Sequence, residues 1–139
     1  MNKPNNLLIK GGRVIDPARR FDQKADLALS GSTLVAIGNI ASEFQPDSLL
    51  DATGCLVMPG AIDIHFHVRA PGHPERGTFI TETQAAAAGG VTTVLEMPIS
   101  VPCCARVDVF EARKALGQRE RYVNVGLVGS PGLLDRDEV

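Results

Sequence analysis

The sequence has few of the features that mark a membrane, nucleic-acid-binding or disulfide-rich protein. No apolar run approaches the roughly 20 residues that a bilayer-spanning helix needs, and the polar residues 1–6 lack the core of a signal peptide. The formal net charge is −2, so no overall electrostatic attraction favours nucleic acid or an anionic membrane. Cys55, Cys103 and Cys104 are odd in number and are not spaced as a zinc knuckle, so we interpret them as reduced thiols. We therefore expect a soluble, cytoplasmic protein.

Up to about residue 58, the pattern indicates short strands joined by tight turns. The predicted strands are residues 7–10, 13–17, 25–29, 33–38, 49–52 and 55–58. Gly11 and Gly12 predict a first hairpin turn, and residues 30–32 predict a second one. A sheet of this size buries too little apolar surface to be stable alone, so we expect another segment to complete it.

After Gly60 the pattern changes to strands that alternate with helices. The predicted strands are residues 62–68, 91–97 and 122–128, and the predicted helices are residues 78–88, residues 107–116 and a segment that begins at residue 135. Thr81 and Gln84 predict a capping box in the first helix, and Gly117 is expected to end the second. Glu96 lies within an otherwise apolar strand, so it should have a buried partner. This alternation is typical of a parallel sheet or barrel.

So few strands and helices cannot close an eight-stranded α/β barrel, which takes roughly 250 residues. The chain is therefore either a small open α/β domain with a β appendage or the front portion of a longer protein. We favour the second interpretation, because the chain ends without a closing element.

Residues 63–69 (DIHFHVR) form the candidate metal site. In an extended strand alternate side chains share a face, and here one face is polar: Asp63, His65, His67 and Arg69. The other face is apolar: Ile62, Ile64, Phe66 and Val68. Two imidazoles at this spacing can bind one metal ion, Asp63 can support the ligand rings, and Arg69 can hold an anionic group. A lone His-x-His is a common coincidence, but this pair ends an apolar run, where an α/β barrel places its working residues.

Taken in order, the motifs resemble the amino-terminal part of the cyclic amidohydrolases, a group that includes dihydroorotases, allantoinases and dihydropyrimidinases or hydantoinases. The resemblance covers essentially the whole chain and rests on residues 11–17 (GGRVIDP), 57–60 (VMPG), 63–72 (DIHFHVRAPG), 85–93 (AAAAGGVTT) and 97–98 (MP). It implies a metal-dependent (β/α)8 barrel beside a β-sandwich. Residues 1–58 would be part of the sandwich, and residues 59–139 would be the first βα units of the barrel.

The resemblance also implies the roles of the candidate residues. His65 and His67 match the paired histidines that hold a divalent metal, usually zinc, in a site of one or two ions. Asp63 would support these ligands, and Arg69 matches the arginine that dihydroorotases use on the substrate carboxylate. The bridging lysine, two further histidines and the proton-carrying aspartate of such enzymes have no counterpart here. We therefore assign no catalytic residue and expect the chain alone to be inactive.

The reaction implied for the complete enzyme is hydrolysis of a carbon–nitrogen bond in a small cyclic amide or ureide. The identity of the substrate ring is left undecided, because Ile99 stands where dihydroorotases carry an asparagine, and other motifs are closer to allantoinases. The complete enzyme is expected to be a homo-oligomer that binds neither nucleic acid nor membrane. The alternative is a catalytically inactive amidohydrolase-like domain with a binding or scaffolding role.

Overall fold

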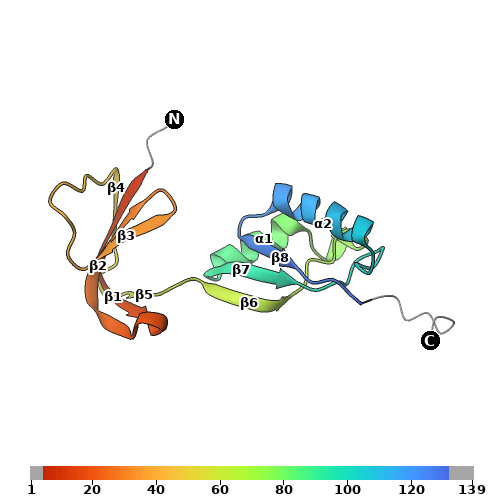
Figure 1. The fold of residues 1–139 in the computed structure, drawn as a ribbon, viewed down its shortest axis with the longest axis horizontal. Helices are drawn as coiled ribbons and strands as arrows, with labels where there is room; N and C mark the ends of the chain where they lie inside the picture. Colours follow the sequence, from red (N-terminus) through yellow and green to blue (C-terminus); the bar gives the residue numbers. More distant parts are fainter. Residues whose placement is uncertain (1–4, 132–139) are drawn as a thin grey trace. The chain divides into compact units, whose positions relative to one another are not determined.

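The computed structural model describes residues 5–131, which fall into two compact units that divide between Pro59 and Gly60 (Figure 1). The helix predicted from residue 135 lies outside the described residues. Among those that are described, no helix is long and apolar enough to cross a membrane.

The first unit is a five-stranded sheet. Its strands are β1 (Asn6–Asp16), β2 (Phe21–Ser30), β3 (Thr33–Ile37), β4 (Ser48–Asp51) and β5 (Leu56–Val57), and the short 3-10 helix η1 (Pro17–Arg19) joins β1 to β2. The order is β3-β2-β1-β4, and β5 also pairs with β1. The predicted second hairpin is confirmed, since β2 and β3 are antiparallel neighbours, whereas β4 and β5 run parallel to β1.

The predicted first hairpin is wrong, because β1 continues through Gly11 and Gly12 as one strand of 11 residues. The register with β2 shifts between Ile9 and Gly12, which is the mark of a β-bulge. Gly11 has a φ of 77°, and its N–H donates to Asp26 Oδ1 at 2.9 Å. The paired glycines therefore bend a strand, and the chain reverses only after Asp16.

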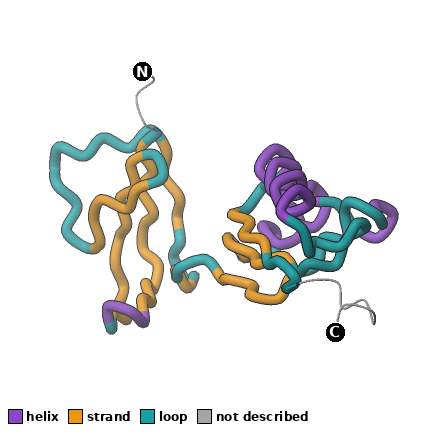
Figure 2. Tube along the Cα trace, turned by 45° about the vertical axis from the view of Figure 1, so that its right-hand side comes forward, coloured by secondary structure: helices purple, strands orange, loops and turns teal. Residues whose placement is uncertain are grey.

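The second unit is a three-stranded parallel sheet in the order β6-β7-β8. Its elements are β6 (Ala61–Phe66), the 3-10 helix η2 (Pro74–Arg76), α1 (Phe79–Ala88), β7 (Val91–Glu96), α2 (Val107–Glu120) and β8 (Asn124–Leu127). Figure 2 shows both α-helices on one side of the strands. This is the predicted α/β alternation, so the fold class is confirmed at that level.

The first helix matches the predicted bounds to within one residue, but its capping pair and the end of the second helix differ from the prediction. The capping box of α1 is made by Thr78 and Thr81, one turn before the predicted pair. Helix α2 continues through Gly117 to Glu120, because this glycine is used for close packing. Its Cα faces the Phe79 ring so closely that an added Cβ would lie 3.1 Å from Phe79 Cε1.

The core of the second unit lies between the sheet and the helices. Val68, Ala70 and Phe79 are buried at its centre. Partly buried apolar side chains pack around them: Phe66, Leu116, Val125 and Leu127. Two residues of this core, Val68 and Ala70, belong to the segment that follows β6, so the core holds the backbone next to the candidate metal ligands.

Candidate metal centre

The two candidate ligands lie at the carboxyl end of β6. His65 is in the strand, and His67 comes directly after its last residue, Phe66. The parallel strands β7 and β8 end at the same edge, which is where open and closed α/β sheets place their functional groups. The topology thus presents both imidazoles at the functional edge of the sheet.

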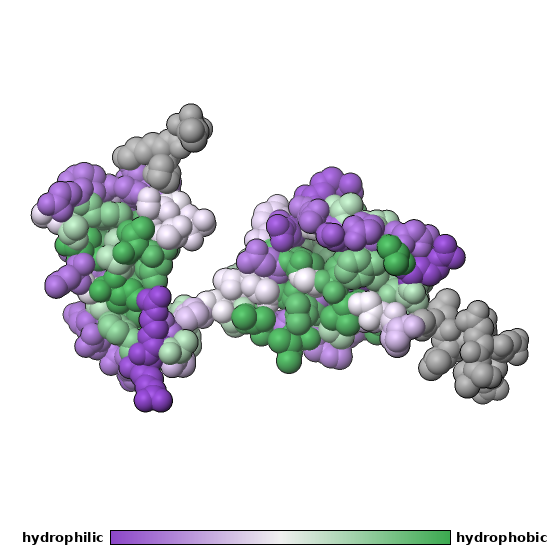
Figure 3. All heavy atoms as spheres, viewed as in Figure 1, coloured by the Kyte–Doolittle hydropathy of each residue, from purple (hydrophilic) through white to green (hydrophobic). Residues whose placement is uncertain are grey.

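The predicted division of β6 into a polar and an apolar face is wrong at its start. Ile62 and Ile64 are 63% and 70% exposed, and apolar surface is visible over this part of the second unit in Figure 3. Phe66 packs instead on the buried core. The register with β7 shifts between Asp63 and Phe66, so an extra residue reverses the alternation. His65 and Ile64 are both exposed.

The two imidazoles lie close together. Their ring centroids are 5.1 Å apart and the ring planes meet at 74°. His65 is exposed, whereas His67 is half-buried, and its Nδ1 atom is buried without a hydrogen-bond partner among the described residues. Burial of His67, together with the positive charges of Arg69 and His65, lowers the pKa of His67, and Asp63 opposes this shift.

These observations fit a divalent metal ion. A lowered pKa favours the neutral imidazole, which is the form of histidine that binds metals. A buried ring nitrogen without a partner costs free energy unless another group binds it. A lone pair of histidines is an incomplete site, however, and no group of three or more ligating side chains occurs within residues 5–131.

Asp63 supports His65 through the backbone. Its Oδ1 accepts a hydrogen bond of 2.9 Å from the backbone N–H of His65, two residues along the chain. This contact holds the main chain of a candidate ligand in place. The sequence predicts that Asp63 supports the ligand rings, whereas the contact that the structure shows is to the backbone amide of His65.

Arg69 follows at the turn that leaves the strand. It is half-buried and has a φ of 69°, which is an unusual backbone conformation for a residue other than glycine. Its carbonyl accepts the N–H of His73 at 3.0 Å. The guanidinium forms no salt bridge within the part of the chain that the structure describes. Because the Arg69 guanidinium forms no salt bridge there, its charge is available to an anionic ligand.

Two other polar side chains, those of His73 and Lys114, pair with nearby carboxylates. The His73 side chain is about half exposed and lies 3.4 Å from Glu75 Oε1, which suits a solvated histidine. Lys114 is on α2, where its Nζ lies 3.2 Å from Glu111 Oε2.

Sequence reasoning missed one residue near the site, Arg113. The buried partner expected for Glu96 exists, and it is the guanidinium of Arg113 on α2. Glu96 and Arg113 are 17 residues apart and on different elements, so no local spacing reveals the pair. Burial raises the pKa of the Glu96 carboxyl, and the Arg113 charge and the Val68 amide oppose that shift.

The chain matches a known sequence family over the region that contains the candidate metal centre. The model of the dihydro-orotase-like family matches residues 54–130, a range that contains β6, both histidines and the sheet behind them. The chain therefore belongs to the dihydro-orotase-like family.

The chain is also similar to particular members of this group. It is 39% identical over 125 residues to a dihydroorotase from Geobacter metallireducens, covering 90% of this chain and 30% of that protein. It is 41% identical over 124 residues to a dihydroorotase from Streptococcus pyogenes serotype M1, covering 87% of this chain and 29% of that protein. The chain thus spans less than a third of the length of these relatives.

Solved structures of hydantoinases have the same fold over this region. An L-hydantoinase (dihydropyrimidinase) from Arthrobacter aurescens matches 91% of this chain and 28% of that chain, with a TM-score of 0.81 and 29% identity. A D-hydantoinase (dihydropyrimidinase) from a Thermus species matches 87% of this chain and 26% of that chain, with a TM-score of 0.70 and 32% identity.

Proposed function

We propose that this chain is the amino-terminal part of a metal-dependent cyclic amidohydrolase, which hydrolyses a carbon–nitrogen bond in a small cyclic amide or ureide. The family match over residues 54–130 carries the proposal, because it includes the paired histidines at the functional edge of the sheet. In the complete protein, residues 59–139 would be the first βα units of a (β/α)8 barrel. Residues 1–58 would be part of a β-sandwich.

His65 and His67 would hold a divalent metal ion, with zinc as the first candidate. Three features of this chain support that assignment: the adjacent rings, the His67 Nδ1 that has no partner among the described residues, and the lowered pKa of His67, which favours its neutral form. Asp63 would keep His65 in position through its backbone amide. When bound, the metal supplies Lewis acidity, which activates water and polarises the amide carbonyl of the substrate. The remaining ligands and the proton-carrying carboxylate would come from other parts of the complete enzyme.

Arg69 favours an anionic ring as the substrate, with dihydroorotate as the first choice. Its guanidinium lies two residues after His67 and has no salt-bridge partner in the described residues, so it can pair with a substrate carboxylate. The two relatives at 39% and 41% identity are both called dihydroorotases, which supports the same choice. Ile99 is 48% exposed and cannot add a hydrogen bond from its side chain. The arginine would therefore carry most of the anion recognition contributed by this chain.

The test is a hydrolysis assay on the longest natural form of the protein, with dihydroorotate, allantoin, hydantoin and dihydrouracil as parallel substrates. We expect turnover of dihydroorotate, a large rise in KM for dihydroorotate in the Arg69→Gln variant, and no such rise for an uncharged ring. Turnover of an uncharged ring alone would move the assignment to a hydantoinase-like activity. A protein that contains metal but hydrolyses none of these rings would favour a scaffolding role.

A further inference from the structure

The backbone on both sides of His67 is held by the end of the neighbouring strand. The carbonyl of Phe66 accepts the N–H of Met97 at 2.9 Å. The N–H of Val68 donates to Oε1 of Glu96 at 3.3 Å. The second contact is unusual, because the Glu96 side chain, and not a backbone carbonyl, accepts the Val68 N–H after β6 has ended at Phe66. His67 thus lies between two backbone groups that both depend on residues 96 and 97.

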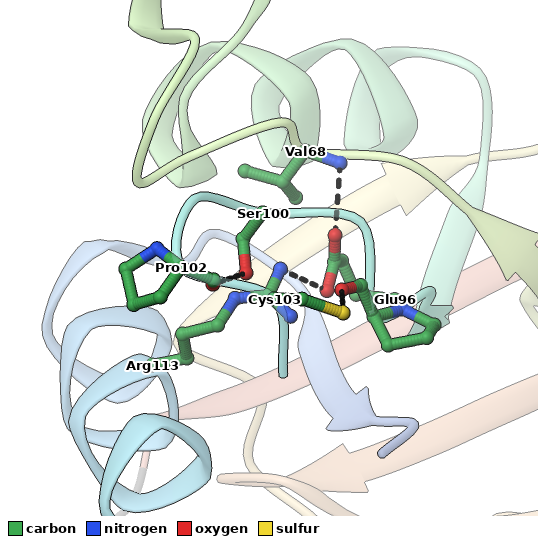
Figure 4. Close-up of polar contacts among 7 residues, drawn as sticks. Val68, Glu96, Ser100, Pro102, Cys103 and Arg113 are labelled. Carbon is green, nitrogen blue, oxygen red and sulfur yellow. Dashed lines mark hydrogen bonds and ion pairs between the residues drawn. The ribbon is translucent and has the colours of Figure 1, made fainter. Parts of the chain in front are cut away.

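The Glu96 carboxylate is itself held from the helix layer. Its Oε2 pairs with Nη2 of Arg113 on α2, and Figure 4 shows Glu96 between Val68 on one side and Arg113 on the other. Glu96 and Arg113 have side-chain exposures of 0% and 1%, and Val68 is also fully buried. A single chain of contacts therefore runs from α2 through β7 to the residue that follows His67.

Stability is a poor explanation for this arrangement. Removing two charges from water costs free energy, and a buried ion pair often stabilises a fold no better than apolar side chains of similar volume. The Arg113 guanidinium also has two buried N–H groups, Nε and Nη1, without hydrogen-bond partners among residues 5–131. An incompletely satisfied ion pair in a core needs a reason other than packing.

We propose that Glu96 and Arg113 are positioning residues for the metal ligand His67. Arg113 orients the Glu96 carboxylate, the carboxylate fixes the Val68 amide, and the fixed amide sets the direction in which the His67 ring leaves the backbone. This inference rests on the proposed function, since it takes His67 to be a metal ligand. It adds a supporting contact that reaches the ligand through its main chain, as Asp63 does for His65.

Two charge-free double variants of the longest natural form isolate the contact to Val68. Glu96→Gln with Arg113→Met keeps a side-chain carbonyl as the acceptor for the Val68 N–H. Glu96→Met with Arg113→Met removes the acceptor at nearly unchanged volume. Both variants lose the ion pair, so they differ mainly in the hydrogen bond that the proposal requires.

Zinc affinity, measured by competition with a chelator, is the first readout. We expect the glutamine variant, which keeps the acceptor but loses the orientation that Arg113 gives it, to lose zinc affinity by no more than about threefold. The methionine variant should lose about 10- to 100-fold, as substitutions behind metal ligands typically do. Hydrogen exchange at the Val68 amide of the metal-free protein is the second readout. This exchange should be faster in the methionine variant than in the glutamine variant.

Thr83→Val is the matched control. Thr83 is fully buried on α1, and its hydroxyl donates to the carbonyl of Phe79 and accepts the N–H of Tyr122 at 3.0 Å, so the variant loses two hydrogen bonds, neither of them to Val68. It should lower stability and keep the zinc affinity. If this control loses as much affinity as the methionine variant, general destabilisation explains the effect and the proposal is overturned.

The remaining outcomes are also decisive. Equal zinc affinities in the two double variants, whether retained or lost, overturn the role of the Val68 contact while leaving the proposed function intact. A wild-type protein that binds no zinc overturns the proposed function itself, and the positioning role with it.

Discussion

Truncating Phe79 should destabilise the second unit more than any change at its surface. The ring is fully buried, and it packs on Val68 and Ala70 and against the backbone of Gly117. Phe79→Ala removes this apolar surface and leaves a cavity between the sheet and α2. Substitutions of this kind in a core cost about 3–5 kcal/mol. That is a large part of the roughly 5–15 kcal/mol by which a typical domain is stable.

The assay is urea unfolding of the longest natural form, followed by circular dichroism. With a slope of about 3 kcal/mol per molar, the midpoint should fall by at least about 1 M. Ile80→Ala is the control, because Ile80 is the next residue of the same helix and is 42% exposed. It should lower the midpoint by much less. Equal midpoints for the two variants would refute the placement of Phe79 at the centre of the core.

Three further results follow from individual contacts. Gly117→Val should destabilise the protein by about 1–3 kcal/mol in the same unfolding assay, because the new side chain must displace the Phe79 ring, and no loss would contradict the close packing. Burial raises the folded-state pKa of Glu96. The stability of wild type relative to Glu96→Gln should therefore fall as pH rises above about 4.3, the usual pKa of an unfolded glutamate. A stability difference that stays flat or rises with pH would contradict the raised pKa. Lys114→Ala removes an exposed pair with Glu111, so unfolding should change by less than about 1 kcal/mol and metal content not at all, and a loss of metal would assign Lys114 a role that its position denies.

The order and type of the elements in the second unit follow from local sequence. Alternating apolar runs and helix-forming segments predict β6, α1, β7, α2 and β8, because periodicity and turn residues act over a few neighbouring positions. The same reasoning finds the histidine pair at the end of β6, since the pair lies next to a turn signal. Local patterns also indicate that Glu96 needs a buried partner.

The errors come from contacts between distant segments. Paired glycines such as Gly11 and Gly12 are typical of a turn, yet strands β2, β4 and β5 pair along β1 and keep it extended. A glycine such as Gly117 is typical of a helix end, yet here its lack of a side chain allows the Phe79 ring to pack on α2. All three glycines approach segments that are distant in the sequence, and their immediate neighbours do not encode these contacts.

The bulge in β6 is the error with the largest consequence for the site. One extra residue between Asp63 and Phe66 breaks the predicted alternation of this strand, and only the register with β7 reveals it. In the same way, the pairing of Glu96 with Arg113 depends on how α2 packs on the sheet. Local sequence therefore proposes the candidate ligands, whereas the bulge beside them and the identity of the Glu96 partner depend on how distant segments pack.

The most direct test of the account is the metal content of the longest natural form, compared with that of His65→Ala and His67→Ala, after each protein has been loaded with zinc and freed of excess metal. Thr92→Ala, which changes an exposed residue at the start of β7, is the control for handling losses. The account predicts bound zinc in the wild type and the control, and a large loss in both histidine variants. Equal zinc in all four proteins, or none in any, would contradict a metal centre at the end of β6.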